Sequence, residues 1–214
     1  MHIPQFNRVT VTPSGGAALP VLLRIPSWAT RATLSVDGGA PVALAGSNGT
    51  FFPTATRAGG GASTFVVDFA PEVRLEPAYN GSVAVYRGAL LYAAWIGQTI
   101  SVTGTHPYNS KDLSVLAALP WNLALVIADA SNPGASLAFT RSTLTNVPYN
   151  STAVPVTLSG KARVVAGWGA ERNAPAPPPA SPACAAPGAC GDEVDVVLVP
   201  FGSTHVRMSV LPLA

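Results

Sequence analysis

The sequence predicts an all-β protein made of two consecutive antiparallel β-sandwich domains of the jelly-roll or immunoglobulin-like kind. Apolar and β-branched residues come in short runs, and Gly, Pro, Asn or Asp separates each run from the next. No segment carries the periodicity of a helix of ordinary length. The chain has 214 residues, of which 48% are hydrophobic, so it can bury two small cores. We place the domains at residues 1–99 and 100–214.

The first domain is expected to contain six strands and to end near residues 98–101. Asp37-Gly38-Gly39 predicts a tight turn, because Gly adopts the positive φ that such turns need. Residues 58–62 (AGGGA) indicate the flexible tip of a hairpin. The predicted strands are residues 18–25, 32–36, 64–69, 72–76, 82–86 and 90–95.

The second domain is expected to contain seven strands, with a strong turn at Asn132-Pro133-Gly134. Residues 107–119 have less periodicity, and Ser110–Leu113 favours the beginning of one short helix. A Pro/Ala-rich insertion at residues 170–191 predicts an extended, exposed loop without a core of its own. The predicted strands are residues 100–103, 123–127, 136–139, 154–158, 162–166, 194–199 and 205–210.

Charge and hydropathy exclude two classes of protein. The net charge is only +2, and the twelve basic residues are spread thinly, which argues against a nucleic-acid partner. No run approaches the ~18 apolar residues that a spanning helix needs, so no membrane span is expected. The first residues do not have the pattern of a signal peptide. The chain is therefore expected to be the mature part of something longer, or cytosolic.

Three N-x-S/T sequons begin at Asn48, Asn80 and Asn150, and they favour a secreted protein in the extracellular space or cell wall. Cys184 and Cys190 are separated by five residues. In an oxidising compartment they would close a small disulfide loop, and otherwise they are free thiols. Two cysteines without a nearby His supply half a ligand set at most, so we expect no metal site.

Several segments carry a resemblance to a known family. Arg24–Trp28 (RIPSW) is followed by the turn at Val36–Gly38, by residues 69–74 (FAPEVR), and by Val83–Tyr92 (VAVYRGALLY). Near the end, residues 160–166 before Trp168 and residues 198–207 continue the pattern. Together these segments resemble the β-domains that follow the catalytic barrel in glycoside hydrolase family 127, the β-L-arabinofuranosidase-like proteins. The resemblance is weak through residues 107–149 and absent from the Pro/Ala-rich insertion, and Ala89 replaces the family's Pro.

The motif residues also have physical interpretations of their own. Pro26 should end a strand, and Trp28 can then fold back as an apolar cap on the sandwich. Arg24 and Arg87 are placed to bond carbonyls, or a carboxylate such as Glu72 or Glu76, at a sheet end. Gly88 permits a bend or a close backbone approach. These roles are structural rather than catalytic.

No catalytic residue is expected on this chain. The resemblance implies a catalytic glutamate and a metal-holding cysteine cluster on a helical barrel, and neither has a counterpart here. Glu72 and Glu76 would be about 13 Å apart on one strand, too far for glycoside hydrolysis. Glu193 and Asp195 are interpreted as part of an exposed acidic turn. His205 is expected in a packing or rim position, since no nucleophile elbow is present.

Exposed aromatic rings offer a way to contact sugars, and we selected Trp121, Tyr108 and Tyr149 because they lie beside loop signals. The resulting expectation is a non-catalytic accessory region of a secreted glycoside hydrolase-like protein. It would brace the catalytic helical barrel of the same precursor, without any cofactor, and would have the option of contacting carbohydrate. The alternatives are a stand-alone carbohydrate-binding or extracellular-matrix module, and a pilus-like or fibre subunit.

Overall fold

The computed structural model describes residues 6–13, 16–44, 46, 49–143, 153–171 and 174–214, with residues 6 and 7 described by their backbone alone. These ranges contain strands and four short 3₁₀ turns but no α-helix, which confirms the all-β prediction. The turns are η1 (Tyr79–Gly81), η2 (Pro107–Asn109), η3 (Pro133–Ala135) and η4 (Phe201–Ser203).

The chain forms two compact units, which we call the N-terminal unit (up to Glu72) and the C-terminal unit (from Val73). The structure therefore divides between Glu72 and Val73, whereas the sequence placed the domain boundary near residues 98–101. The reason is that strand β9 (Leu90–Trp95) pairs with β17 (Cys190–Pro200), about a hundred residues further along the chain. Such long-range pairing draws the segment around residues 73–95 into the C-terminal unit.

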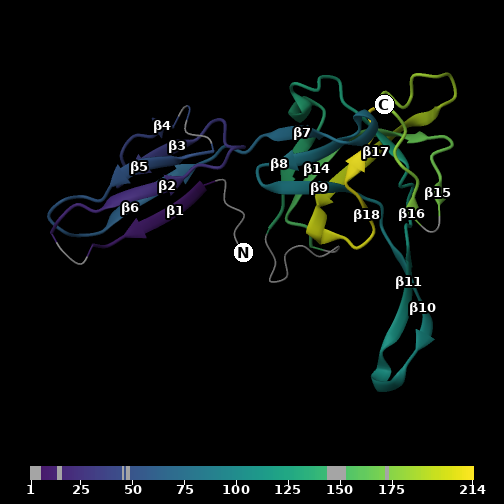
Figure 1. Ribbon diagram of the computed structural model, residues 1–214, viewed down its shortest axis with the longest axis horizontal. Coiled ribbons are helices and arrows are strands. Elements are labelled where there is room, and N and C mark those ends of the chain that lie inside the picture. Colours follow the sequence, from purple (N-terminus) through teal and green to yellow (C-terminus); the bar gives the residue numbers. More distant parts are fainter. Residues whose placement is uncertain (1–5, 14–15, 45, 47–48, 144–152, 172–173) are drawn as a thin grey trace. The chain divides into compact units, whose positions relative to one another are not determined.

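The N-terminal unit contains two antiparallel sheets, labelled in Figure 1. Residues 58–62, expected as a hairpin tip, connect strands of different sheets instead. The four-stranded sheet has the order β1 (Phe6–Val11), β6 (Ser63–Asp68), β3 (Thr33–Val36) and β4 (Val42–Ala43). The second sheet pairs β2 (Pro20–Arg24) with β5 (Phe51–Ala55). The sequence did not predict β1, β4 or β5.

The two sheets enclose one apolar core, which includes the fully buried Ile25 and Phe65. Trp28 packs on this core, with its ring 5.6 Å from that of Phe69 in an edge-to-face arrangement. Arg24 donates hydrogen bonds to the carbonyls of Ile25 (2.7 Å) and Thr50 (3.2 Å). The structural roles expected of Arg24 and Trp28 are confirmed.

The C-terminal unit is built on one large sheet that curls until its ends meet. Its strand path is β12 (Leu123–Val126), β14 (Val156–Val165), β17, β9, β8 (Val83–Arg87) and β19 (Val210–Leu211). Three further strands attach to it: β7 (Val73–Pro77), β13 (Ala138–Arg141) and β18 (Arg207–Met208). Just beyond β19, Leu213 forms a parallel bridge with Leu125 of β12, which closes the path.

Two glycines allow the backbone of this sheet to turn or to pack closely. Gly88 has φ +58° in the two-residue turn of the β8–β9 hairpin, where Arg87 pairs with Leu90. This is the bend expected from the Arg87-Gly88 sequence. In β14, a Cβ on Gly160 would lie 2.7 Å from the carbonyl oxygen of Ser136. Gly160 lies between the β14 residues that pair with β13 and those that pair with β12.

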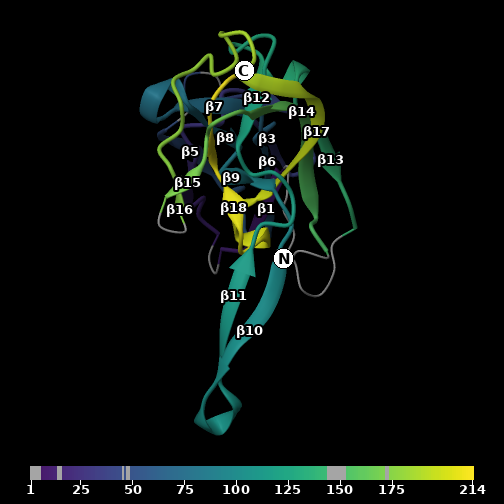
Figure 2. The same ribbon diagram turned by 90° about the vertical axis from the view of Figure 1, so that its right-hand side faces the viewer.

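A two-stranded hairpin extends away from the curled sheet of the C-terminal unit, as Figures 1 and 2 show. It pairs β10 (Thr99–Thr105) with β11 (Lys111–Leu116), and the η2 turn forms its tip. The short helix expected to begin at residues 110–113 is therefore wrong. Only residues 112–115 (DLSV) alternate between polar and apolar as a strand does, and the turn at Pro107–Asn109 allows them to fold back on β10.

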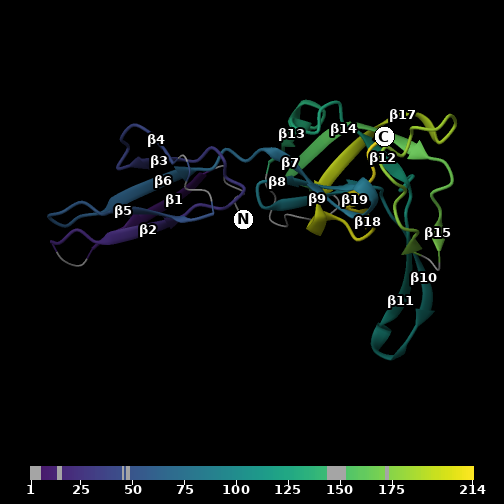
Figure 3. The ribbon, with the colours of Figure 1, turned by 45° about the horizontal axis from the view of Figure 1, so that its top comes forward.

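The Pro/Ala-rich insertion packs on the C-terminal unit rather than remaining an exposed loop. Its beginning forms a small ribbon of β15 (Ala170–Glu171) and β16 (Ala174–Pro175), both labelled in Figure 2; Figure 3 labels β15. We call residues 174–191 the strap. Several of its residues pack against a small core cluster of buried side chains from β12, β14 and the segment after β14. The cluster is Ala124, Val165 and Trp168, and the strap contributes Ala176, Ala183, Cys184 and Cys190.

Candidate functional site

An apolar pocket in the C-terminal unit lies at the base of the β10–β11 hairpin, and we call it the base pocket. Its volume is about 520 Å³, which is within the range of small-ligand sites. Most of its lining is apolar, and two basic side chains join it. The lining includes Ile96, Val115, Leu116, Trp121, His205, Arg207 and Met208, together with residues of β15 and β16.

Trp121, one of the predicted sugar-contacting residues, forms part of this pocket but is half-buried. Its ring packs edge-on against that of the buried Trp168, with 5.3 Å between ring centroids. Trp168 in turn donates its indole N–H to the Ala176 carbonyl of the strap (2.9 Å). Trp121 therefore links the pocket to the core beneath the strap.

His205 and Arg207 contribute the polar part of the base pocket. His205 is exposed, as expected for a rim residue. The Arg207 guanidinium donates to the carbonyls of Phe201 and Thr204 and lies 3.9 Å from the centroid of the Phe201 ring. Arg207 was not among the site residues predicted from the sequence. Its position two residues after His205, within a strand-like run, was the available signal.

Tyr108 is fully exposed at the tip of the hairpin, in the η2 turn. Val115 and Leu116, which line the base pocket, lie at the opposite end of the same hairpin. Tyr108 and Trp121 therefore do not form one surface within a single chain. Tyr149, the third predicted residue, lies outside the described residues.

Of the three sequons, only the one at Asn80 is described; Asn48 and Asn150 lie outside the described residues. Asn80 is exposed in the η1 turn with φ +55°. Its side-chain amide donates to the Pro178 carbonyl of the strap (3.0 Å), and its own carbonyl accepts from Ser181 (2.9 Å). The amide nitrogen carries two hydrogens, so an attached glycan would still leave one for the Pro178 bond.

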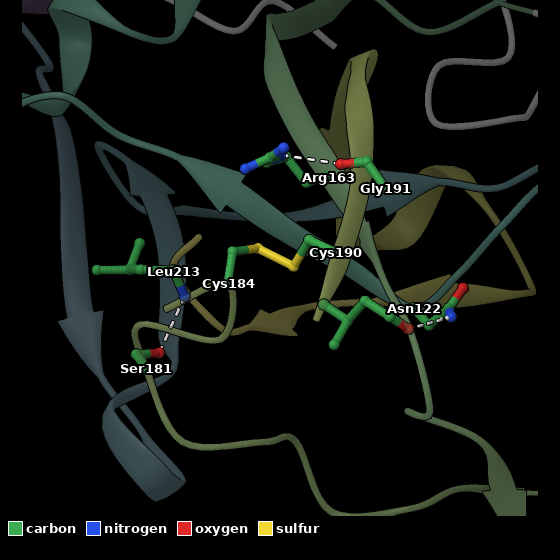
Figure 4. Close-up of a disulfide and its surroundings, with 8 residues drawn as sticks. Asn122, Arg163, Ser181, Cys184, Cys190, Gly191 and Leu213 are labelled. Carbon is green, nitrogen blue, oxygen red and sulfur yellow. Dashed lines mark hydrogen bonds between the residues drawn. A yellow bond between two sulfur atoms is a disulfide. The ribbon is translucent and has the colours of Figure 1, made fainter. Parts of the chain in front are cut away.

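Cys184 and Cys190 form a disulfide, as Figure 4 shows. The bond joins the middle of the strap to the first residue of β17. Next to it lies a second, more open hollow whose lining includes Arg163, Cys184 and Glu193. Arg163 of β14 donates to the Gly191 carbonyl (2.9 Å) and so holds the last residue of the strap. Of the two states that the sequence left open, the structure has the disulfide.

Glu193 and Asp195 do not lie in an acidic turn, because both are within β17. Asp195 pairs with Lys161 of β14 (2.9 Å), and Glu193 lies opposite Arg163 in the strand register. The Asp195 carboxylate raises the pKa of Lys161 above its usual value. Both acidic side chains are exposed. They belong to a cross-strand set of opposite charges, and no group of three His, Cys, Asp or Glu suited to a metal occurs among the described residues.

Arg87 of the Arg-Gly motif has a scaffold role in the structure. Its guanidinium lies 3.5 Å from the centroid of the Phe139 ring and so connects β8 to β13. Burial lowers the pKa of Arg87, Tyr92 opposes this effect, and neighbouring Arg141 lowers it further. No described carboxylate pairs with Arg87, so an aromatic ring takes the place of the carboxylate or carbonyl expected there.

The fold defined by these units is shared with part of a larger class of enzymes. One solved structure, described as a glycoside hydrolase, matches 99% of this chain with a TM-score of 0.55 and 22% identity. A second, described as a GH127 β-arabinofuranosidase, matches 100% of this chain with a TM-score of 0.55 and 15% identity. This chain spans 31% of the length of each.

The resemblance to family 127 is thus confirmed at the level of the fold. No family model matches the chain, and no curated protein does. The described part of the chain contains no helix with the length and apolarity needed to cross a membrane.

Proposed function

We propose that this chain is the non-catalytic β-region of a larger secreted protein of the family 127 type, and that it braces that protein's catalytic helical barrel. The main support for the proposal is that the structural match covers nearly all of this chain but only a part of each enzyme. Two glycoside hydrolase structures match essentially all of this chain, whereas the chain spans 31% of each of them. A region that corresponds to a third of an enzyme is expected to work beside the remainder.

The N-terminal unit offers a surface for such packing. On the β2–β5 sheet, Leu22 and Phe51 are 65% and 59% exposed, and Leu22 lies opposite Pro53 in the register. Arg24 stacks over Phe51 and is itself tied to two carbonyls. This Arg-Ile-Pro-x-Trp motif therefore stabilises an apolar outer face, which a neighbouring domain would cover.

The proposal assigns no hydrolase chemistry to this chain. The nearby carboxylates on one strand, Glu193 and Asp195, face basic partners on β14 rather than an enclosed cleft. Glycoside hydrolysis needs two carboxyl groups that flank a bound sugar. The disulfide of the strap and the exposed sequon at Asn80 support secretion as part of the same proposal.

A stand-alone carbohydrate-binding module is the less supported function. Its simplest form needs two or more exposed rings on one face. Tyr108 lies at the tip of the hairpin, whereas Trp121 lines the pocket at its base and is half-buried against Trp168. These two rings cannot stack on neighbouring sugars within a single copy of the protein.

The test is an activity assay on the purified chain with an aryl β-L-arabinofuranoside, using a complete family 127 enzyme as positive control. We expect turnover no higher than in a mock preparation purified from cells that lack the gene. Turnover that follows the chain through every purification step, at a constant specific activity, would contradict the proposal.

A further inference from the structure

The β10–β11 hairpin has one apolar face. Ile100 lies opposite Val115 and Val102 lies opposite Leu113, so these four side chains project on the same side of the ribbon. Ile100, Val102 and Leu113 are 50%, 54% and 53% exposed. A two-stranded hairpin is marginally stable alone in water. This face therefore needs a cover, which the described residues do not provide.

The tip of the hairpin presents a single aromatic ring. Tyr108 has φ +63°, a conformation that is unusual for a bulky residue. The turn around it is well tied: His106 pairs with Asp112 (2.6 Å), and the His106 N–H donates to the Ser110 carbonyl (2.8 Å). Tyr108 is thus held outward by a built turn, with its entire side chain in solvent.

The base of the same hairpin contains a hollow that suits this ring. Val115 and Leu116 belong both to the hairpin and to the base pocket, whose 520 Å³ exceeds the volume of a tyrosine side chain. The lining is mostly apolar, which suits the ring, and His205 at the rim can exchange a hydrogen bond with a phenol. A strand of this length spans about 20 Å, so Tyr108 cannot reach the pocket of its own chain.

We propose that two copies of this chain form a two-fold symmetric dimer through their hairpins. The apolar faces pack antiparallel, and Tyr108 of each copy enters the base pocket of the other. Two-fold symmetry makes every contact occur twice. Tyr108 of each copy is therefore buried, and the base pocket of each copy is filled. Two ribbon faces and two buried tyrosines amount to roughly 1,000 Å², at the low end of stable interfaces. The dimer therefore dissociates on dilution, and it does not depend on the proposed function.

The first test is the mass of the full chain in solution, measured by sedimentation over a wide concentration series. We expect a reversible shift from 21.8 kDa to twice that mass. Tyr108→Asn should weaken the dimer about tenfold or more, because each dimer buries two such rings and Asn tolerates the left-handed turn. The matched control is Ser101→Thr on the opposite face of the hairpin, which should leave the dissociation constant unchanged.

The second test reports the antiparallel arrangement directly. In the double variant Tyr108→Cys/Leu116→Cys, the two new thiols are too far apart to bond within one chain. Oxidation should therefore give a covalent dimer, whereas each single variant should give none. A chain that stays monomeric at every concentration would overturn the proposal. A dimer that is unaffected by Tyr108→Asn and does not cross-link through these cysteines would also overturn it.

Discussion

Leu213, next to the end of the chain, pairs with Leu125 in a parallel bridge that closes the curled sheet of the C-terminal unit. Leu125 donates its N–H to the Pro212 carbonyl (2.8 Å) and accepts from the Ala214 N–H (2.9 Å). On its other side, Leu213 accepts from the Ala183 N–H (2.7 Å) and donates to the Ser181 hydroxyl (2.9 Å), as Figure 4 shows in part. The last residues thus lie between β12 and the strap and are hydrogen-bonded to both.

Deletion of residues 212–214 should strongly destabilise the C-terminal unit. Four hydrogen bonds are lost and the fully buried Leu125 keeps unpaired backbone groups, so the expected cost is roughly 5 kcal/mol. Leu213→Ala is the matched control, because it retains the backbone bonds and removes only a half-buried side chain. Urea denaturation measures both variants. If the deletion costs no more than the substitution, the closure does not stabilise the unit.

The disulfide should stabilise the C-terminal unit by restricting its unfolded state. The bond joins residues six apart in sequence, and a loop of this size is worth about 2 kcal/mol. Cys184→Ser/Cys190→Ser should lower the free energy of unfolding by that amount. It should also increase amide exchange at Ala183 and Leu213, which the strap holds together. Unchanged exchange in the variant would mean that the hydrogen bonds alone hold the strap.

Asp37 makes the N-terminal unit sensitive to acid. Its carboxylate accepts from the Thr64 N–H (2.7 Å) and from Arg57 (2.9 Å), and the backbone hydrogen bond is the main cause of its lowered pKa. Because the folded pKa lies below the ordinary value of 3.8, the stabilisation is present above that pH and is lost as the pH falls through the folded pKa.

The Asp37→Asn variant should therefore be less stable than the parent at neutral pH, and the difference should disappear in strong acid. Thermal unfolding at a series of pH values measures this. Asp192→Asn, on the exposed part of β17, is the control and should differ little from the parent throughout. A difference between parent and Asp37→Asn that is constant down to the lowest pH would contradict the charge-based explanation.

Local features were predictable because they depend on neighbours in sequence. Asp37 and Gly38 both have positive φ in the expected turn, and Pro26 and Trp28 end a strand and cap a core as predicted. Long-range pairing was not predictable in the same way. The short apolar run Leu90–Trp95 indicates a strand, but nothing in it shows that its partner is β17.

The strap and the hairpin likewise depend on long-range contacts that the sequence does not reveal. Proline and alanine content predicted a loop without a core, yet Trp168 and Asn80 bind the strap from outside it, and a disulfide links its two cysteines. Composition alone does not record such contacts. Tyr108 was correctly selected as exposed, whereas its separation from Trp121 follows from strand register, which a single sequence leaves open.

The size of the native polypeptide tests the central claim most directly. This chain weighs 21.8 kDa and spans 31% of the matched enzymes, and 21.8 divided by 0.31 gives about 70 kDa. An antibody raised against residues 73–214 should detect a secreted species of about that mass in a reducing gel of the native source. A single native species of about 22 kDa would contradict the account.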